Sequence, residues 1–292
     1  MELTQPQQPN PPPSAAPGGL VLQPARVLGA WLPEQTGLQL LTASGPVDLS
    51  TSITQLQALR QTVAGRPPYT GTFMSCRDLP TELDAHMTHF WANPACQAFV
   101  AEGWTARIVD LRAIVAGQDR VWLDGVPIPH PPKTLAELAE ITLPAAPSDH
   151  QINAQVHGSG VLVSSVNPNL RSLGPYVGKV GPSGPTVVGF VIGVPHSVLQ
   201  VAELDGRPIL RDGYHRAVEL LRYDIDEVPA LVRTMTSTEE VLLPQPGILP
   251  TAAWLSDRPP TLPDFLDDTV SLDMRLPRRD EKAIVVQCVE FA

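Results

Sequence analysis

A short polar stretch, DGYHR at residues 212–216, has the residue types and spacing of an anion-binding turn. It joins a segment that alternates like a strand to a segment with helical spacing, so Gly213 falls at the junction. Glycine there permits a positive φ and a close approach of the backbone to a ligand. The first turn of a helix leaves N–H groups that attract anions, and His215 and Arg216 add cationic donors. The stretch therefore predicts a phosphate site.

Strands are expected on both sides of this turn. Residues 198–204 and 207–211 read as two strands of a hairpin. The Asp205-Gly206 pair between them is typical of a tight hairpin turn. Residues 228–235 form a further apolar segment and are predicted to be the strand that follows the helix.

The helix after Gly213 has a clear apolar face. The residues on that face follow the spacing i, i+3, i+4 and i+7, and they are Tyr214, Ala217, Val218 and Leu221. Arg216, Glu219 and Arg222 lie on the other face at intervals of three, where they are able to pair. This spacing predicts a helix whose charged residues are exposed to solvent.

The segment 198–232, VLQVAELDGRPILRDGYHRAVELLRYDIDEVPALV, resembles the core of the ParB/sulfiredoxin superfamily. The family pattern is a hairpin that ends in D-G-x-x-R, then a helix, then a strand that begins V-P. The matching residues here are Asp212, Gly213, His215 and Arg216, followed by Val228-Pro229. Residues 105–118, TARIVDLRAIVAGQ, are similar to the family's opening strand and turn.

The resemblance implies an α+β fold, with a ParB/sulfiredoxin-like mixed sheet and helices, extended at both ends. It also implies a nucleotide-binding function, because family members hold the phosphates of CTP, ATP or ADP at the glycine turn. Carried over, the phosphate- or nucleotide-binding residues are Asp212, Gly213, Tyr214, His215 and Arg216. Phosphoryl transfer or hydrolysis, with a nucleotide and Mg²⁺, is left open.

Departures from the family pattern reduce the number of family functions that this chain is expected to share. Sulfiredoxin-type chemistry is associated with G-C-H-R, and this chain has Tyr214 at the cysteine position. Proline is frequent after Met235, which leaves little room for the helix-turn-helix of partitioning proteins. The candidate catalytic carboxylates are Glu102, Asp110, Asp119 and Asp212, and nothing in the sequence selects among them. The alternatives are a non-catalytic nucleic-acid or protein-interaction module, or a ParB-like nuclease.

Charge and composition favour a small ligand. The chain has 292 residues, a formal net charge of −10 and 33 prolines, which argues against a helical bundle. The window 171–222 contains six basic and four acidic residues, and this local positive balance suits a phosphorylated small molecule better than long DNA. The three cysteines form no metal-binding pattern, and no metal site is predicted. The start of the chain does not resemble a signal peptide and no membrane span is predicted, so we expect a cytoplasmic protein.

Four regions are predicted along the chain. They are a disordered Pro/Gln-rich tail (1–19), a partly helical extension (20–102), the ParB/sulfiredoxin-like core (103–235) and a Pro-rich extension (236–292). The core carries an insertion near 126–185, and residues 143–185 read as long loops with one strand at 160–166. Helices are expected at 48–63, at 79–102 with a break at Asn93-Pro94, and at 133–141.

Overall fold

The computed structural model describes residues 21–45, 48–71, 76–123, 128–146, 152–157, 160–167, 170–179, 184–194, 196–242, 247–278 and 282–287. The predicted tail at 1–19 lies outside these ranges. The strands are β1 (Val21–Val27), β2 (Arg77–Asp78), β3 (Thr105–Asp110), β4 (Val115–Ala116), β5 (Arg120–Trp122), β6 (Asn153–His157), β7 (Gly160–Ser165), β8 (Arg171–Lys179), β9 (Thr186–Gly193), β10 (Gln200–Leu204), β11 (Arg207–Asp212), β12 (Glu227–Thr234), β13 (Leu272–Arg278) and β14 (Lys282–Gln287). The α-helices are α1 (Glu34–Ala43), α2 (Leu49–Ala64), α3 (Asp84–Ala92), α4 (Gln97–Ala101), α5 (Leu135–Thr142), α6 (Tyr214–Arg222), α7 (Thr238–Val241) and α8 (Thr251–Trp254).

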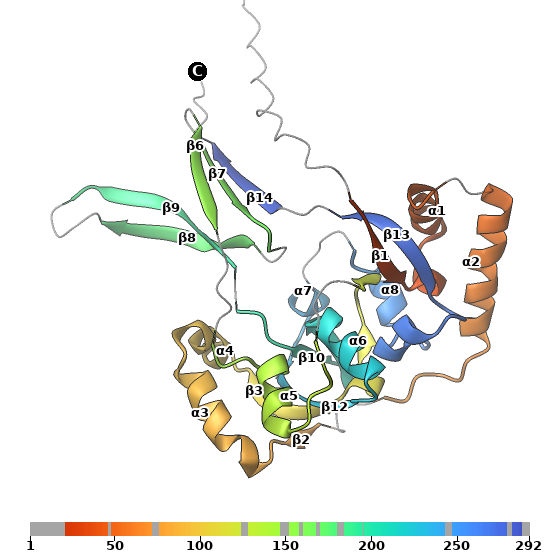
Figure 1. Ribbon diagram of the computed structural model, residues 1–292, viewed down its shortest axis with the longest axis horizontal. Helices are drawn as coiled ribbons and strands as arrows, with labels where there is room; N and C mark the ends of the chain where they lie inside the picture. Colours follow the sequence, from red (N-terminus) through yellow and green to blue (C-terminus); the bar gives the residue numbers. More distant parts are fainter. Residues whose placement is uncertain are drawn as a thin grey trace, which may run out of the picture.

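The central sheet has the strand order β2-β3-β12-β10-β11-β4 (Figure 1). Strands β10 and β11 form the predicted hairpin, and its turn residues Asp205 and Gly206 both have positive φ, at 52° and 80°. Two consecutive positive φ values give the turn whose twist matches a hairpin, which explains the Asp-Gly pair. Strand β12 runs parallel to β10, so the chain returns through α6 to reach it. The predicted order of hairpin, helix and strand is confirmed.

Several predicted helices are also confirmed. Helix α2 begins after Asp48, whose side chain accepts a hydrogen bond from the Thr51 N–H at 2.9 Å and so caps the helix. The region 79–102 divides at Asn93, where α3 ends and the short turn before α4 begins. Helix α5 occupies the segment expected at 133–141.

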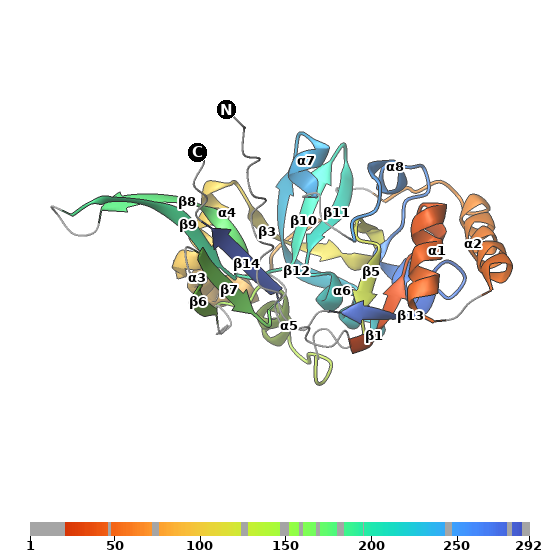
Figure 2. The ribbon, with the colours of Figure 1, turned by 90° about the horizontal axis from the view of Figure 1, so that it is seen from above.

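A second sheet has the order β13-β1-β5 and lies beside α1 and α2 (Figures 1 and 2). Strand β1 pairs with β13 over seven residues, from Val21↔Arg278 to Val27↔Leu272. This pairing was not predicted, because the two strands are almost the whole chain apart and β13 follows a proline-rich stretch. The apolar side chains of this sheet and of the central sheet belong to one continuous core.

In 143–185 the predicted strand at 160–166 is confirmed as β7, but the expectation of long loops around it is wrong. Strands β6, β7 and β14 form a three-stranded sheet, and β8 and β9 form a separate two-stranded ribbon. Figures 1 and 2 show the ribbon projecting away from the body of the molecule. Glycine and proline within β8 hide its alternation, and β7 pairs with β14 at the far end of the sequence. The architecture is therefore α+β with several sheets. Among the described helices none could span a bilayer, and the longest, α2, has 16 residues.

Candidate functional site

Gly213 connects β11 to α6 in the left-handed conformation, with φ 97° and ψ 17°. A Cβ at this position would lie 3.1 Å from the Cα of Leu199, so the close backbone approach is made to the protein's own chain. The Asp212 Oδ1 accepts a hydrogen bond from the Gly213 N–H at 2.7 Å. The predicted glycine junction is present, and its conformation and close packing both require glycine.

Tyr214, the first residue of α6, points into the core. Its hydroxyl donates to the Leu210 carbonyl at 2.5 Å and accepts from the Gly117 N–H at 2.8 Å. Burial raises the pKa of this hydroxyl well above its usual range. The side chain thus holds α6 against β11 and the segment after β4. The Tyr214 side chain is therefore directed away from the surface of the turn, and its backbone N–H is the group left for the predicted phosphate contact.

Arg216 is also directed inward and is only 9% exposed. Its Nη1 donates to the carbonyls of Ile141 and Ser197 at 3.1 and 3.0 Å, and its Nη2 donates to the Ser197 Oγ at 2.9 Å. The expectation that Arg216 shares an exposed face with Glu219 is wrong, because α5 and the segment before β10 fold over that side of the helix. The expected pairing of Glu219 with Arg222 is confirmed at 3.1 Å.

The charge of Arg216 is held mainly by carbonyl and hydroxyl oxygens. Among the described residues no carboxylate oxygen lies within 4.0 Å of its guanidinium group. Burial lowers the pKa of Arg216, and the charge of Asp212 opposes that shift. The Ile141 carbonyl lies in the last turn of α5, where the helix dipole is negative and partly compensates a cation. Three of the five N–H donors of the guanidinium are used in these bonds.

The start of α6 retains features of an anion site in its backbone. The first intrahelical bond is donated by the Ala217 N–H to the Gly213 carbonyl, at 2.9 Å. The N–H groups at 214–216 precede that bond, and they are the groups that a helix leaves for an outside acceptor. No acidic residue stands in this first turn, and no side chain caps it. The half-buried His215 belongs to the same turn. The candidate donors are thus the backbone amides, while the Arg216 guanidinium is bonded to Ile141 and Ser197.

The four candidate carboxylates lie in different surroundings. Glu102 accepts from the Trp104 Nε1–H at 3.0 Å, and Asp110 receives the backbone N–H of Arg112 at 2.9 Å. Asp119 is buried in a two-pronged pair with the neighbouring Arg120, at 2.6 and 2.7 Å. Asp212 adjoins Gly213 at the turn. Position therefore favours Asp212 over the other three as a group that could act on a ligand there.

Sequence reasoning missed Ser197 and Ile141, the two residues that position Arg216. They precede it by 19 and 75 residues. Ser197 comes just before the predicted first strand of the hairpin. That position gave no indication that Ser197 contacts Arg216. No pattern in the sequence indicated that the end of α5 approaches α6.

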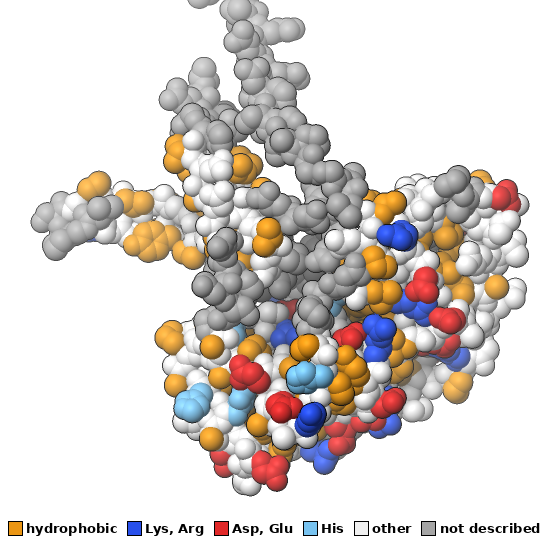
Figure 3. Space-filling model, viewed as in Figure 1, with side chains coloured by type: hydrophobic (Ala, Val, Ile, Leu, Met, Phe, Trp, Pro, Cys, Tyr) orange, Lys and Arg blue, Asp and Glu red, His pale blue; other side chains and the backbone are white. Residues whose placement is uncertain are grey.

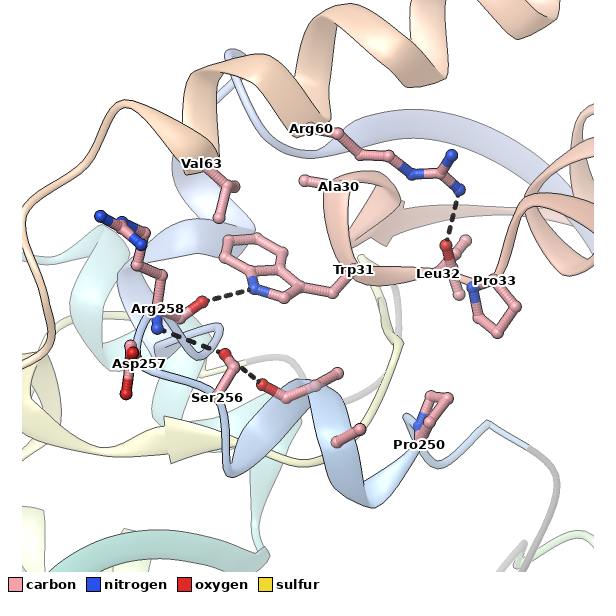
Figure 4. A pocket seen from close by; sticks show the side chains of 12 residues that line it. Ala30, Trp31, Leu32, Pro33, Arg60, Val63, Pro250, Ser256, Asp257 and Arg258 are labelled. Carbon is pink, nitrogen blue, oxygen red and sulfur yellow. Dashed lines mark hydrogen bonds between the residues drawn. The ribbon is translucent and has the colours of Figure 1, made fainter.

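A surface hollow of about 550 Å³ lies elsewhere, between α2, α8 and the turn that contains Trp31 (Figure 4). The Trp31 indole N–H donates to the Arg258 carbonyl at 2.8 Å, and Arg60 donates to the Leu32 carbonyl at 2.9 Å. Figure 4 shows the indole lying between Val63 and Arg258. The hollow includes none of residues 212–216. A binding experiment must therefore distinguish a ligand at the turn from a ligand in this hollow.

Comparison with known proteins gave no match to a family model, to a curated protein or to a solved structure. Within the described ranges, no group of three or more His, Cys, Asp and Glu side chains is arranged to hold a metal ion.

Proposed function

We propose that this chain binds a phosphate group, of a nucleotide or of a phosphorylated small molecule, at the first turn of α6. The observation that carries the proposal is the buried Arg216 guanidinium, which stands in an uncapped helix turn with no carboxylate within 4.0 Å among the described residues. A buried cation is costly unless a negative group compensates it. Asp212 supplies part of that compensation from beyond 4.0 Å, and a phosphate at the turn would add to it.

The binding mode keeps the backbone donors expected from the sequence and changes the roles of the Tyr214 and Arg216 side chains. The phosphate accepts hydrogen bonds from backbone N–H groups at 214–216, as anions commonly do at helix N-termini. Arg216 contributes its charge and its remaining donors, while Tyr214 fixes the orientation of the helix. The resemblance to the ParB/sulfiredoxin superfamily supports a nucleotide as the source of the phosphate. Whether a reaction follows would depend on Asp212, the carboxylate adjoining the turn.

Thermal unfolding in the presence of CTP, ATP, ADP or inorganic phosphate, with and without Mg²⁺, tests this proposal. A specific ligand at 100 times its Kd stabilises by about 2.7 kcal/mol and raises the Tm. Ser197→Ala is the matched control, because it removes one acceptor of Arg216 and leaves its charge in place. We expect Ser197→Ala to retain the ligand-induced shift and Arg216→Met to lose most of it. No shift in the wild type at millimolar ligand would contradict the proposal.

The second candidate is a protein-interaction module. One observation favours it, namely the ribbon of β8 and β9, which carries exposed apolar side chains away from the body of the molecule. This candidate does not exclude the first, because the ribbon and the turn are separate parts of the structure.

A further inference from the structure

Strands β6, β7, β8 and β9 are inserted between α5 and β10, and we call them the inserted strands. They pair with one another and with β14, and among the described strand pairs none joins them to the central sheet. On the face seen in Figure 3, charged side chains gather over the body of the molecule rather than over these strands. The chain leaves the body through residues 141–146, the outgoing connection, and returns through residues 196–199, the returning connection.

Every backbone carbonyl from 141 to 145 in the outgoing connection accepts a hydrogen bond from another part of the chain. The donors are, in order, the Arg216 Nη1, the Leu199 N–H, the His86 Nε2, the His196 Nε2 and the Asn93 Nδ2, at 3.1, 2.8, 2.8, 2.6 and 2.9 Å. Two of these donors, Leu199 and His196, belong to the returning connection. The two connections are therefore bonded directly to each other.

Arg216 joins the two connections a third time. Its guanidinium bonds the Ile141 carbonyl in the outgoing connection and both the carbonyl and the Oγ of Ser197 in the returning one. We call this set of contacts, made by Arg216, His196 and the Leu199 N–H, the clasp. The clasp is buried, since His196 is 8% exposed and Arg216 9%. One side chain of α6 thus holds together the two ends of the inserted strands.

The clasp and the proposed phosphate turn share Arg216. While the clasp is closed, three bonds fix the guanidinium, so this long side chain is already ordered when an anion arrives. If the connections separate, Arg216 loses these acceptors and an anion must order it again. Conversely, the charge of Arg216 is buried in the closed clasp and Asp212 compensates it in part, so an anion at the turn lowers the cost of closure.

We propose that the clasp regulates the phosphate turn: the closed clasp raises the affinity for phosphate, and bound phosphate favours the closed clasp. The proposal rests on the proposed function and adds a second part of the molecule to it. The two effects are equal in size, because linkage between binding and a conformational equilibrium is reciprocal. Strand β14 pairs with β7 and ties the inserted strands to the body at a further point. Movement of the inserted strands therefore reaches the turn through Arg216.

Two histidines provide a matched test, because they donate to the neighbouring carbonyls of Leu143 and Pro144. Only His196 spans the two connections, whereas His86 lies on α3. In calorimetric titrations with inorganic phosphate and with ADP, below the Tm of each variant, His196→Leu should raise the Kd at least about fivefold. His86→Leu should stay within about twofold of the wild type. His196→Gln should restore the affinity, because its side-chain amide can donate to the same carbonyl.

Hydrogen exchange of the Leu199 amide measures the clasp itself, since this N–H donates to the Thr142 carbonyl across the two connections. Saturating ADP should slow its exchange in the wild type at least about fivefold, and His196→Leu should speed it without ligand. Amides in the last turn of α2 exchange by local fraying and should not respond. The wild-type measurement needs no variant, so it tests the coupling even where His196→Leu fails to fold.

Three results would overturn the coupling while phosphate binding by the wild type still stands. They are equal affinity in His196→Leu and the wild type, equal losses of affinity in the two leucine variants, and a Leu199 exchange rate that ADP does not change. A wild type that binds neither phosphate nor ADP at millimolar concentration contradicts the proposed function itself, and the coupling with it.

Discussion

Arg216 lies in the interior of the structure and at the proposed ligand site, so its replacement should affect both stability and binding. Arg216→Ala removes three hydrogen bonds, two of which end on the backbone carbonyls of Ile141 and Ser197. It also disconnects the last turn of α5 from the first turn of α6. Arg216→Met is the more selective change, because it keeps most of the buried stem and removes only the guanidinium group.

The expected loss of stability follows from these bonds. A hydrogen bond to a charged group contributes about 1.5–3 kcal/mol, and a buried carbonyl left without a donor costs about 1–3 kcal/mol. The variant no longer buries a charge, and this offsets part of the loss. Ile141 and Ser197 are also partly accessible to water, which reduces the cost of leaving their oxygens without the guanidinium. We therefore expect Arg216→Ala to lower the free energy of unfolding by about 2–4 kcal/mol.

Urea unfolding, followed by circular dichroism, measures this difference. Arg222→Ala is the control on the same helix, because its ion pair with Glu219 is exposed and such pairs contribute about 0–1 kcal/mol. A loss of less than about 1 kcal/mol for Arg216→Ala would refute the claim that Arg216 stabilises the contact between α5 and α6. A large loss in Arg216→Ala combined with nucleotide affinity equal to that of the wild type, measured well below the Tm, would refute its part in phosphate binding.

Four further predictions follow from the described contacts. Gly213→Ala should lower the free energy of unfolding by about 1–3 kcal/mol in urea, because φ is 97° and the new Cβ would meet the Leu199 backbone. Tyr214→Phe should cost about 1–3 kcal/mol in the same assay, because two buried partners lose their hydrogen bonds. Cys96 should resist iodoacetamide at neutral pH in the folded protein, by peptide mass spectrometry, because it is buried and its pKa is raised to about 11. Burial raises the pKa of Tyr69 from 10.0 to about 12. The contribution of its neutral hydroxyl to stability is therefore full below pH 10 and is lost as the pH rises toward 12. Tyr69→Phe should flatten the pH dependence of the urea midpoint between pH 10 and pH 12.

The hairpin, α6 and β12 could be predicted from the sequence because their signals are local. The Asp205-Gly206 turn requires two positive φ values, and the apolar residues of α6 repeat with helical spacing. The capped start of α2 at Asp48 is of the same kind. In each case the residues that decide the structure are neighbours in the chain.

The orientation of Arg216 could not be predicted in this way. Helical spacing gives the relative positions of side chains on a helix, but which side is covered depends on what packs against it. The covering groups are Ile141 and Ser197, brought in by α5 and by the approach to β10. Strand β8 escaped prediction because glycine and proline interrupt its alternation. The pairing of β1 with β13 escaped it because the two strands are almost the whole chain apart.

Backbone amide chemical shifts during a titration with ADP, CTP or ATP test the central claim most directly. The account predicts saturable shifts that are largest at the amides of Tyr214, His215 and Arg216, with weaker effects near Ser197. A titration to millimolar nucleotide that leaves these amides unmoved would contradict the claim. So would shifts confined to the hollow around the Trp31 indole, because they would place the ligand at a different site.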